Sequence, residues 1–438
     1  MFPLSHMLKA FVRTGTLKVI DADGREHVFA GTSSPTVTMR LTDRSLYHKL
    51  FLNPELHAGE AYMDGRMSFE HGSTVRDFLT LFSLNRSSLA NYPLQSVLKR
   101  ISRGVKRFQQ ANPVGKAEKN VAHHYDLGNE FYKLFLDKGM QYSCAYFIDD
   151  DDTLEEAQQN KLRLLASKLQ LKPGLRILDI GSGWGDLALY LATMEDVDVT
   201  GVTLSKEQHA LSNEKARRAG LSDRVRFELL DYRKLEGRFD RIVSVGMFEH
   251  VGVQHYGEFF AKINALLDDD GLMVLHSIGK MSPPGTASPW LRKYIFPGAY
   301  SPALSEVFPV VEQNGLWVTD LEFLRLHYAK TLNHWHRRFE ANRAQIASMY
   351  DERFCRMFEF YLISAETMFT SGSQLVFHMQ LARKRDAAPI VRDYITDLQR
   401  HYRLQESERL KILRQNEPEP APVSDAAPAS SQGQVRVS

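Results

Sequence analysis

The sequence predicts an α/β fold built on a doubly wound, mostly parallel sheet, with a smaller α+β domain in front of it. Strand-like segments alternate with helix-like segments over the middle of the chain, which implies right-handed crossovers and a sheet covered on both faces. A glycine-rich turn, Gly181-Ser-Gly-Trp-Gly185, joins the first strand to a helix-like segment. Ligands of such sheets bind beyond the carboxyl ends of the strands. The strand candidates are 176–180, 197–203, 225–230, 241–245 and 272–277, with helices such as 186–192, 206–219 and 256–267 between them.

Patterning and composition divide the chain into five parts. The first part contains a helix-like segment at 4–12, a hairpin signal at Asp23-Gly24, a strand-like segment at 36–41 and a helix-like segment at 45–51. The end of the chain is rich in Pro, Ala, Ser and Gln, so we expect it to be disordered. The parts are an N-terminal α+β domain at 1–88, a basic amphipathic linker helix at 89–118, the α/β domain at 119–386, a C-terminal helix at 387–415 and a tail at 416–438.

The linker has two interpretations. Apolar residues recur at helical spacing from Leu94 to Phe108, and basic residues such as Lys99 and Arg103 fill the positions between them. A helix of this kind can lie on an anionic membrane surface, gaining about 1 kcal/mol per basic residue. It can equally pack its apolar stripe against a neighbouring domain. The sequence leaves both interpretations open.

Overall composition excludes several classes of protein. A formal net charge of +2 over 438 residues argues against wholesale nucleic-acid binding. Two cysteines, Cys144 and Cys355, cannot form a disulfide framework or a cysteine-based zinc site, and they fit a reducing cytoplasm. No run of about 18 apolar residues is present, so we expect no membrane-spanning helix. We also expect no signal peptide.

The residues around the predicted strand ends indicate the kind of ligand. The G-x-G-x-G spacing differs from both the P-loop and the dinucleotide-binding turn. Asp179, two positions before the first glycine, suits a ligand that carries positive charge or hydroxyl groups. After the second strand, Gln208 either replaces the carboxylate that usually holds a ribose or belongs to a capping box with Ser205, and both roles can hold together. Asp231, after the third strand, suits the adenine end of a nucleoside.

Two other chemistries receive little support. His123 and His124 are adjacent, whereas two metal ligands on one helix face are three or four residues apart, so we expect no metal. Cys144 is a conceivable nucleophile, but nothing in the sequence lowers the pKa of its thiol.

Several motifs in the same order resemble the cyclopropane fatty acid synthase family, which includes the phospholipid and the mycolic acid cyclopropane synthases. The match covers about 119–386, and the segment Gly59-Glu-Ala-Tyr-Met-Asp-Gly65 resembles the extra domain of the phospholipid-acting members. The family has the Rossmann-like fold of S-adenosylmethionine (SAM) methyltransferases. The motifs are His124-Tyr-Asp-Leu-Gly128, Tyr142-Ser-Cys144, Leu178-Asp-Ile-Gly-Ser-Gly-Trp-Gly185, Gly201-Val-Thr-Leu-Ser205, Phe248-Glu-His-Val-Gly252 and Lys293-Tyr-Ile-Phe-Pro-Gly298.

The resemblance implies SAM and bicarbonate as cofactors. An alkene is a poor nucleophile and needs the activated methyl of SAM, while ring closure needs a base in a water-poor pocket. For SAM, the implied residues are Tyr125, Tyr142 and Ser143 at the methionine part, Asp179, Gly181 and Gly183 at its amino group and backbone, Thr203 and Gln208 at the ribose, and Asp231 at the adenine end. For bicarbonate, they are the backbone of Cys144 and Ile278 with the side chains of Glu249, His276 and Tyr328. The competing interpretation is that Glu249 and His250 merely cap a helix.

The implied activity is the addition of a methylene group across the cis double bond of unsaturated phospholipid acyl chains. The alternatives are methylation without ring closure, methylation of a small amine, and non-enzymatic lipid binding. We expect a cytoplasmic protein, peripheral on the inner face of the membrane, and dimerisation through the N-terminal domain would suit attack on a flat bilayer. Aromatic residues are expected to contact the acyl chain, unless they belong to the ordinary core. They are Trp290, Tyr294, Phe296, Tyr300, Phe358, Phe360, Tyr361 and Phe369.

Overall fold

The computed structural model describes residues 1–90 and 127–411. Several sequence predictions lie outside the described residues: the amphipathic helix around 94–108, the metal candidates His123 and His124, the cofactor candidate Tyr125, and the tail at 416–438.

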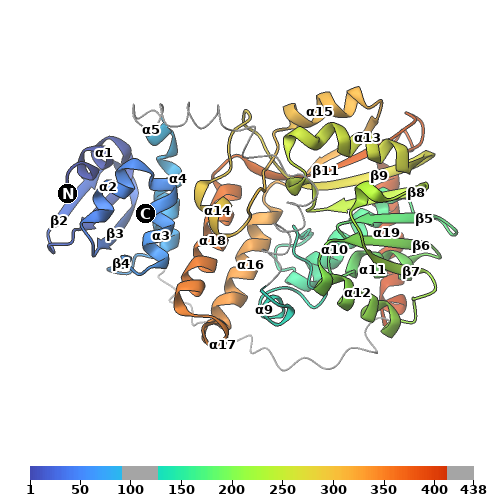
Figure 1. The fold of residues 1–438 in the computed structure, drawn as a ribbon, viewed down its shortest axis with the longest axis horizontal. Coiled ribbons are helices and arrows are strands. Elements are labelled where there is room, and N and C mark those ends of the chain that lie inside the picture. Colours follow the sequence, from blue (N-terminus) through green and yellow to red (C-terminus); the bar gives the residue numbers. More distant parts are fainter. Residues whose placement is uncertain (91–126, 412–438) are drawn as a thin grey trace, which may run out of the picture.

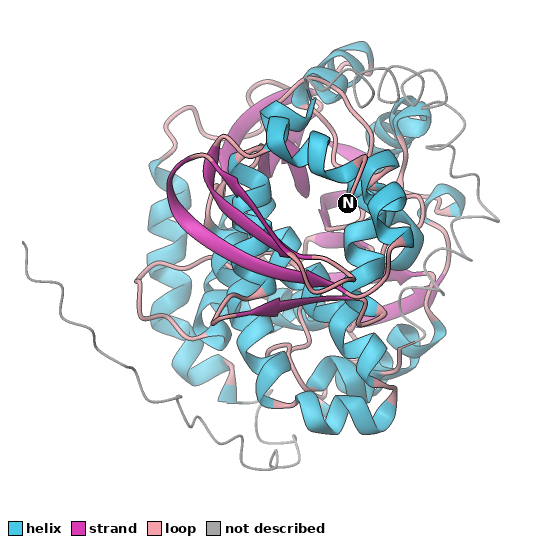
Figure 2. Ribbon diagram, turned by 90° about the vertical axis from the view of Figure 1, so that its left-hand side faces the viewer, coloured by secondary structure: helices cyan, strands magenta, loops and turns pink. Residues whose placement is uncertain are grey.

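The first 90 residues form a four-stranded sheet packed against helices (Figures 1 and 2). The sheet order is β2-β1-β3-β4, with β1 and β3 parallel and the outer pairs antiparallel. The hairpin predicted at Asp23-Gly24 joins β1 to β2, and Gly24 has the positive φ of 80° that such a turn requires. The elements are α1 (Leu4–Phe11), β1 (Thr14–Ile20), β2 (Glu26–Ala30), β3 (Thr32–Leu41), α2 (Ser45–Leu52), α3 (Pro54–Met63), β4 (Met67–Glu70), α4 (Val75–Leu84) and α5 (Arg86–Ala90).

A seven-stranded sheet forms the core of the second part and confirms the predicted α/β fold. Its order is β10-β11-β9-β8-β5-β6-β7, and the five strands from β9 to β7 are parallel. Because β6 and β8 flank β5 on opposite sides, the chain reverses direction across the sheet there, which leaves a crevice at the strand ends. The strands are β5 (Arg176–Ile180), β6 (Asp198–Thr203), β7 (Val225–Leu229), β8 (Phe239–Val245), β9 (Leu267–Lys280), β10 (Trp317–Phe323) and β11 (Gln374–Ala382).

Alternate side chains of each strand point to opposite faces of this sheet, and helices cover both. On one face, Ile177 and Val243 join a hydrophobic cluster with residues of α10, α11 and α19. On the other, Leu178 and Ile242 join a second cluster with residues of α13 and α15. The helices are α10 (Leu154–Leu169), α11 (Asp186–Met194), α12 (Lys206–Arg218), α13 (Tyr256–Leu266), α15 (Leu304–Gln313) and α19 (Asp393–Arg409).

Strands β10 and β11 were not predicted. They form an antiparallel pair, and β11 also runs antiparallel to β9, so the sheet is mixed at this edge. Helices inserted between the two strands stand between the sheet and the N-terminal domain (Figure 1). The inserted helices are α16 (His327–Ala341), α17 (Arg343–Met349) and α18 (Glu352–Thr370). The remaining helices are α14 (Pro289–Tyr294) and the short α9 (Asn129–Lys133).

The N-terminal domain packs tightly on the inserted helices. One hydrophobic cluster contains Leu50 and Phe78 of the N-terminal domain as well as Trp290 and Phe358 of the helices. At Gly59 on α3, an added Cβ would lie 2.4 Å from Nε1 of Trp290. In the described ranges, no helix combines the length and hydrophobicity needed to cross a membrane.

Candidate active site

Two cavities meet at the carboxyl ends of the strands. The first, which we call the sheet-edge cavity, has a volume of about 180 Å³ and is lined by the turn after β5 and by the ends of β6 and β8. The second, the interdomain cavity, has a volume of about 1000 Å³ and is lined by both the N-terminal domain and the α/β domain. The residues that line both are Tyr142, Ser143, Gly246 and His250. The two cavities therefore adjoin, so that groups bound in each can meet.

The glycine turn shapes the sheet-edge cavity. Gly181, Gly183 and Gly185 all have positive φ, at 80°, 56° and 86°. Residues with a Cβ rarely adopt this backbone conformation. A Cβ on Gly185 would lie 2.6 Å from Phe227, so this position must pack closely. A Cβ on Gly183 would meet no atom of the described residues within 4 Å, because this glycine faces open space. The turn thus leaves its backbone accessible to a ligand.

Asp179 places a buried carboxyl group in this cavity. The side chain lies at the end of β5, is 2% exposed, and its Oδ2 has no hydrogen-bond partner among the described residues. Burial raises the pKa of Asp179 to about 7, and the nearby Lys161 ammonium counteracts this only in part. A buried carboxylate oxygen without a partner favours a ligand that supplies a positive charge.

Lys161 is a site residue that the sequence did not reveal. It lies on α10, is buried, and its Nζ donates to Oε1 of Gln141 (2.5 Å) and to Oγ of Ser143 (3.0 Å). Gln158, one helical turn earlier, donates to the carbonyl oxygen of Ser143 (3.0 Å). The two side chains share a helix face and fix the 141–143 loop. Burial lowers the pKa of Lys161 to about 8.

The ends of β6 and β7 carry the other predicted cofactor residues. Thr203 Oγ1 donates to Oε1 of Gln208 (2.7 Å), and Ser205 caps α12 by accepting from the Gln208 amide (3.3 Å). Gln208 therefore pairs with Thr203 rather than closing a capping box. Asp231 accepts from Nη2 of Arg233 (2.6 Å). Burial opposes ionisation of Asp231, but the hydrogen bonds from Arg233 outweigh it and hold its pKa below the usual value.

The five residues predicted around the anion all line the interdomain cavity. Glu249 lies in a short 3₁₀ turn (Phe248–His250) that follows β8, and His276 and Ile278 lie near the end of β9. Tyr328 comes from α16, and Cys144 from the loop that Lys161 fixes. The fold thus brings together residues that are up to 184 positions apart, between Cys144 and Tyr328.

Glu249 is arranged to take up or release a proton near neutral pH. Its Oε1 accepts from the backbone N–H of Ile278 (2.6 Å), and its Oε2 is buried without a hydrogen-bond partner among the described residues. Burial raises the pKa of Glu249 to about 7, although the Ile278 amide favours the charged form. The resemblance assigned the Ile278 amide to the anion, whereas in the structure this amide donates to Glu249. A protonated Oε2 can donate a hydrogen bond into the cavity.

His276 has a buried partner that the sequence did not indicate. Its Nδ1 lies 2.7 Å from Nε2 of His378 on β11. Burial lowers the pKa of both imidazoles well below the usual value, so both are neutral. His378 escaped prediction because strand β11 itself was not predicted.

Cys144 is unsuited to act as a nucleophile. Its thiol is 1% exposed and donates to the carbonyl oxygen of Ala145 (3.3 Å). Burial raises the pKa of the thiol well above its usual value. Because the thiolate is the reactive species, this environment keeps Cys144 inert.

Aromatic side chains make up much of the wall of the interdomain cavity. Tyr294 and Phe358, which were also expected there, do not line it: Tyr294 donates to Glu60 (2.8 Å), and Phe358 stacks on Phe339 in the core. The aromatic residues that do line it are Phe78, Phe82, Tyr142, Trp290, Phe296, Tyr300, Tyr328, Phe360, Tyr361 and Phe369. Leu52, Pro54, Ala58 and Leu79 of the N-terminal domain extend this wall. Such a cavity fits an apolar ligand.

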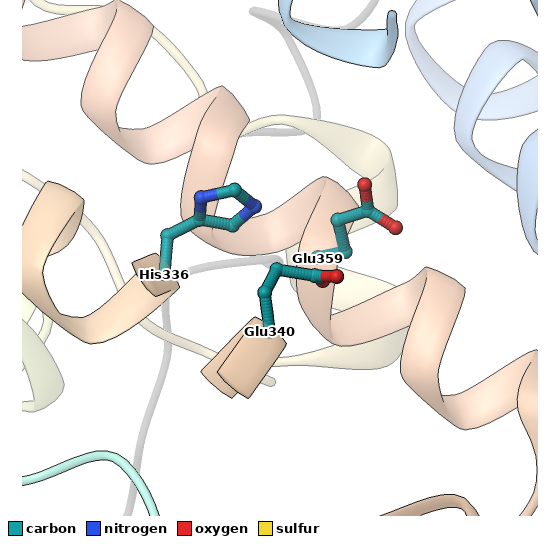
Figure 3. A group of neighbouring side chains, drawn as sticks. All are labelled: His336, Glu340 and Glu359. Atoms are coloured by element: carbon teal, nitrogen blue, oxygen red, sulfur yellow. The ribbon is translucent and has the colours of Figure 1, made fainter. Parts of the chain in front are cut away.

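His336, Glu340 and Glu359 gather between α16 and α18 with spacing that could hold a cation (Figure 3). Arg343 already pairs with the two carboxylates, because its Nη1 lies 2.7 Å from Glu340 and 2.9 Å from Glu359. Tyr62 of α3 donates to Glu359 (2.9 Å). The group therefore serves as a polar tie between the N-terminal domain and the inserted helices.

Comparison with known proteins finds related sequences and structures. The family model of mycolic acid cyclopropane synthetase matches residues 114–379. The cyclopropane-fatty-acyl-phospholipid synthase of Escherichia coli K12 is 39% identical over 334 residues, which cover 75% of this chain and 83% of that protein. The tuberculostearic acid methyltransferase of Mycobacterium tuberculosis is 32% identical over 388 residues, covering 85% of this chain and 90% of that protein.

A solved mycolic acid cyclopropane synthase, in complex with SAH and CTAB, superposes with a TM-score of 0.58 at 35% identity and covers 60% of this chain and 97% of its own. These matches confirm the SAM methyltransferase fold and show that the chain is a SAM-dependent methyltransferase, and they imply a lipid substrate. The chain belongs to the mycolic acid cyclopropane synthetase family of SAM-dependent methyltransferases.

Proposed function

We propose that this enzyme adds a methylene group across the cis double bond of unsaturated phospholipid acyl chains. One observation carries the proposal. Glu249, His276 and Tyr328 line a large aromatic cavity that directly adjoins the cavity with the glycine turn. Its volume of about 1000 Å³ lies at the upper end of the roughly 300–1,000 Å³ typical of small-molecule sites, as a long chain requires.

The sheet-edge cavity fits SAM. The partnerless Oδ2 of Asp179 would accept from the amino group of the methionine part, and the open backbone at Gly183 would lie along it. Thr203 and Gln208 would meet the ribose, with Asp231 beyond them at the adenine end. Bound there, SAM supplies an electrophilic methyl group. Tyr142 and Ser143, which line both cavities, would position the reacting ends.

The interdomain cavity suits a small anion beside the double bond. Glu249 with a proton on Oε2, a neutral His276 and the Tyr328 hydroxyl would offer three donors from residues that are almost fully buried. A bicarbonate ion held there would supply the base for ring closure. The faces of Phe296 and Tyr361 would stabilise positive charge on the chain.

We further propose that the protein works at the inner membrane surface, with the N-terminal domain facing the lipid. The N-terminal domain contributes one wall of the interdomain cavity, and the E. coli relative is by name a cyclopropane-fatty-acyl-phospholipid synthase. The membrane interpretation of the linker and the homodimer remain predictions.

The test combines the protein with SAM and vesicles of a monounsaturated phospholipid, with saturated vesicles as the control. The acyl chains are then released and weighed. We expect a gain of one CH2 in a product that resists mild hydrogenation, and no product from saturated lipid. A gain of CH2 in a chain that still takes up hydrogen would instead establish methylation without ring closure. That second activity is favoured by the similarity to the tuberculostearic acid methyltransferase, which is named for methyl transfer.

A further inference from the structure

A pair of buried histidines lies behind the wall of the interdomain cavity. His276 on β9 and His378 on β11 are directly opposite each other in the antiparallel register of these strands. Their ring centroids are 4.7 Å apart, and Nδ1 of His276 lies 2.7 Å from Nε2 of His378. The side chains are 2% and 0% exposed, but only His276 lines the cavity. His378 can therefore act on the site only through His276.

One proton lies in the hydrogen bond between the two rings, and two arrangements are conceivable. Both rings are neutral, so each carries one N–H. If His276 were the donor, the proton of His378 would lie on its Nδ1. If His378 were the donor, its Nδ1 would carry a lone pair, and the proton of His276 would lie on Nε2.

The surroundings of His378 distinguish the two arrangements. Its Nδ1 is buried without a hydrogen-bond partner among the described residues. Buried N–H groups without an acceptor are rarer than acceptors without a donor. The arrangement with a bare Nδ1 is thus favoured, which makes His378 the donor at Nε2. His276 then accepts at Nδ1 and carries its own proton on Nε2.

We propose that His378 is a positioning residue that holds His276 in the Nε2–H tautomer, so that His276 donates a hydrogen bond to the anion beside the acyl chain. The opposite tautomer would present a lone pair on Nε2 and would repel that anion. A purely structural role explains His378 less well, because an apolar side chain of similar volume would avoid its desolvation cost. This inference rests on the proposed function in one respect, the presence of the anion.

The first experiment reads the tautomer in the free protein and needs no turnover. The full-length protein, labelled with ¹⁵N in histidine, is studied by long-range ¹H–¹⁵N NMR, and the His276 signals are assigned by their loss in His276→Gln. We expect the Nε2–H form of His276 in the parent protein. Observation of the Nδ1–H form would overturn the proposal.

Two substitutions of His378 separate positioning from packing. His378→Gln keeps an N–H donor at nearly the same reach, whereas His378→Leu removes it. We expect His378→Gln to keep the Nε2–H form and turnover within about threefold of the parent, and His378→Leu to mix the tautomers and lower kcat by about 10- to 100-fold, as loss of an orienting partner does elsewhere. The affinity for SAM, measured by calorimetry, should stay unchanged in both.

Each outcome has one meaning. An unchanged tautomer together with unchanged kcat in His378→Leu would overturn the proposal, as would a His378→Gln variant that is as inactive as His378→Leu while both remain folded by circular dichroism. If His378→Leu does not fold, the tautomer seen in the spectrum of the parent protein and the turnover of His378→Gln still test the proposal. The expected tautomers in a protein that gives no cyclopropane product would leave the positioning role standing and refute the proposed reaction.

Discussion

The sheet-edge cavity and the interdomain cavity are built in different ways. The first is lined by residues between Gly139 and Val251, which come from strand ends and turns of one domain, and it contains Asp179, Asp186 and Lys161. The second is lined by residues from Leu52 to Gln374, which come from both domains and include Phe, Tyr and Trp side chains. The sheet-edge cavity is thus shaped mainly by local turn chemistry, whereas the interdomain cavity depends on the packing of distant elements.

The two cavities nevertheless share one electrostatic feature. Asp179 in the first and Glu249 in the second are both buried, both have an oxygen without a hydrogen-bond partner among the described residues, and burial raises the pKa of each to about 7. They differ in their neighbours, since Lys161 favours ionisation of Asp179, whereas Glu249 receives only the Ile278 amide and other uncharged groups. Both carboxyls can therefore take up or release a proton near neutral pH.

The largest effect should come from Glu249→Gln, which keeps an acceptor for the Ile278 amide and a donor to the anion but cannot exchange the proton that Glu249 would share with the bicarbonate. We expect turnover to fall by about 10²- to 10⁴-fold, the range for loss of a general acid or base, with the SAM affinity unchanged by calorimetry. Glu258→Gln, at an exposed position of α13, is the matched control. Equal loss of turnover and of SAM affinity would show that Glu249 helps to bind the cofactor. The two cavities would then not act independently.

Glu249→Gln should also stabilise the protein. The pKa rise from 4.5 to about 7 means that the folded state retains a proton that the unfolded state has lost. The stability of the parent therefore falls as pH rises from about 4.5 to about 7, by about 3 kcal/mol. The free energy of unfolding of the variant, measured with denaturant at a series of pH values, should not show this decrease with pH. An identical slope in both proteins would contradict the burial argument.

Asp179→Asn should lower the affinity of the sheet-edge cavity for SAM and leave the interdomain cavity unaffected. Loss of a charge-assisted hydrogen bond to the cofactor costs about 1.5–3 kcal/mol, so we expect the SAM affinity to fall by about 10- to 100-fold. In the parent, the affinity should fall as the pH drops below about 7, because the carboxylate becomes protonated; the variant should not show this dependence. Binding of a phospholipid vesicle serves as the control and should be unchanged.

Gly59→Ala tests the dependence of the lipid site on domain packing. The new Cβ would lie 2.4 Å from Trp290, whose side chain lines the interdomain cavity, so α3 and α14 must separate. Overpacking costs about 1–3 kcal/mol, and we expect a rise in the lipid KM of about 5- to 50-fold with SAM affinity unchanged. Gly257→Ala, where an added Cβ meets no described atom within 4 Å, should be neutral.

The smallest effect should come from Tyr62→Phe at the polar tie between the domains. The variant loses the hydrogen bond to Glu359 but keeps the ring. We expect a loss of about 1 kcal/mol in the free energy of unfolding, with activity retained. A large loss of turnover would show that this tie controls the lipid cavity and does more than stabilise the interface.

The sequence by itself determined the parts of the site that depend on local chemistry. Strand β5 has the predicted limits, and β6, β7, β8 and β9 contain or closely match the predicted segments. The positive φ of Gly181, Gly183 and Gly185 follows from a turn that only glycine adopts readily. The pairing of Thr203 with Gln208 was within reach because the two residues are close in the chain.

Only the tertiary structure decided the contacts between distant segments. The pairing of β11 with β9 places His378 beside His276 across 102 positions, and no local pattern encodes that register. Lys161 of α10 is buried because it binds the distant 141–143 loop. The N-terminal wall of the interdomain cavity exists because α3 and α4 pack on α14 and α18. Strand period and turn conformation are properties of a few consecutive residues, whereas burial and hydrogen-bond partners depend on which surfaces meet when the chain closes.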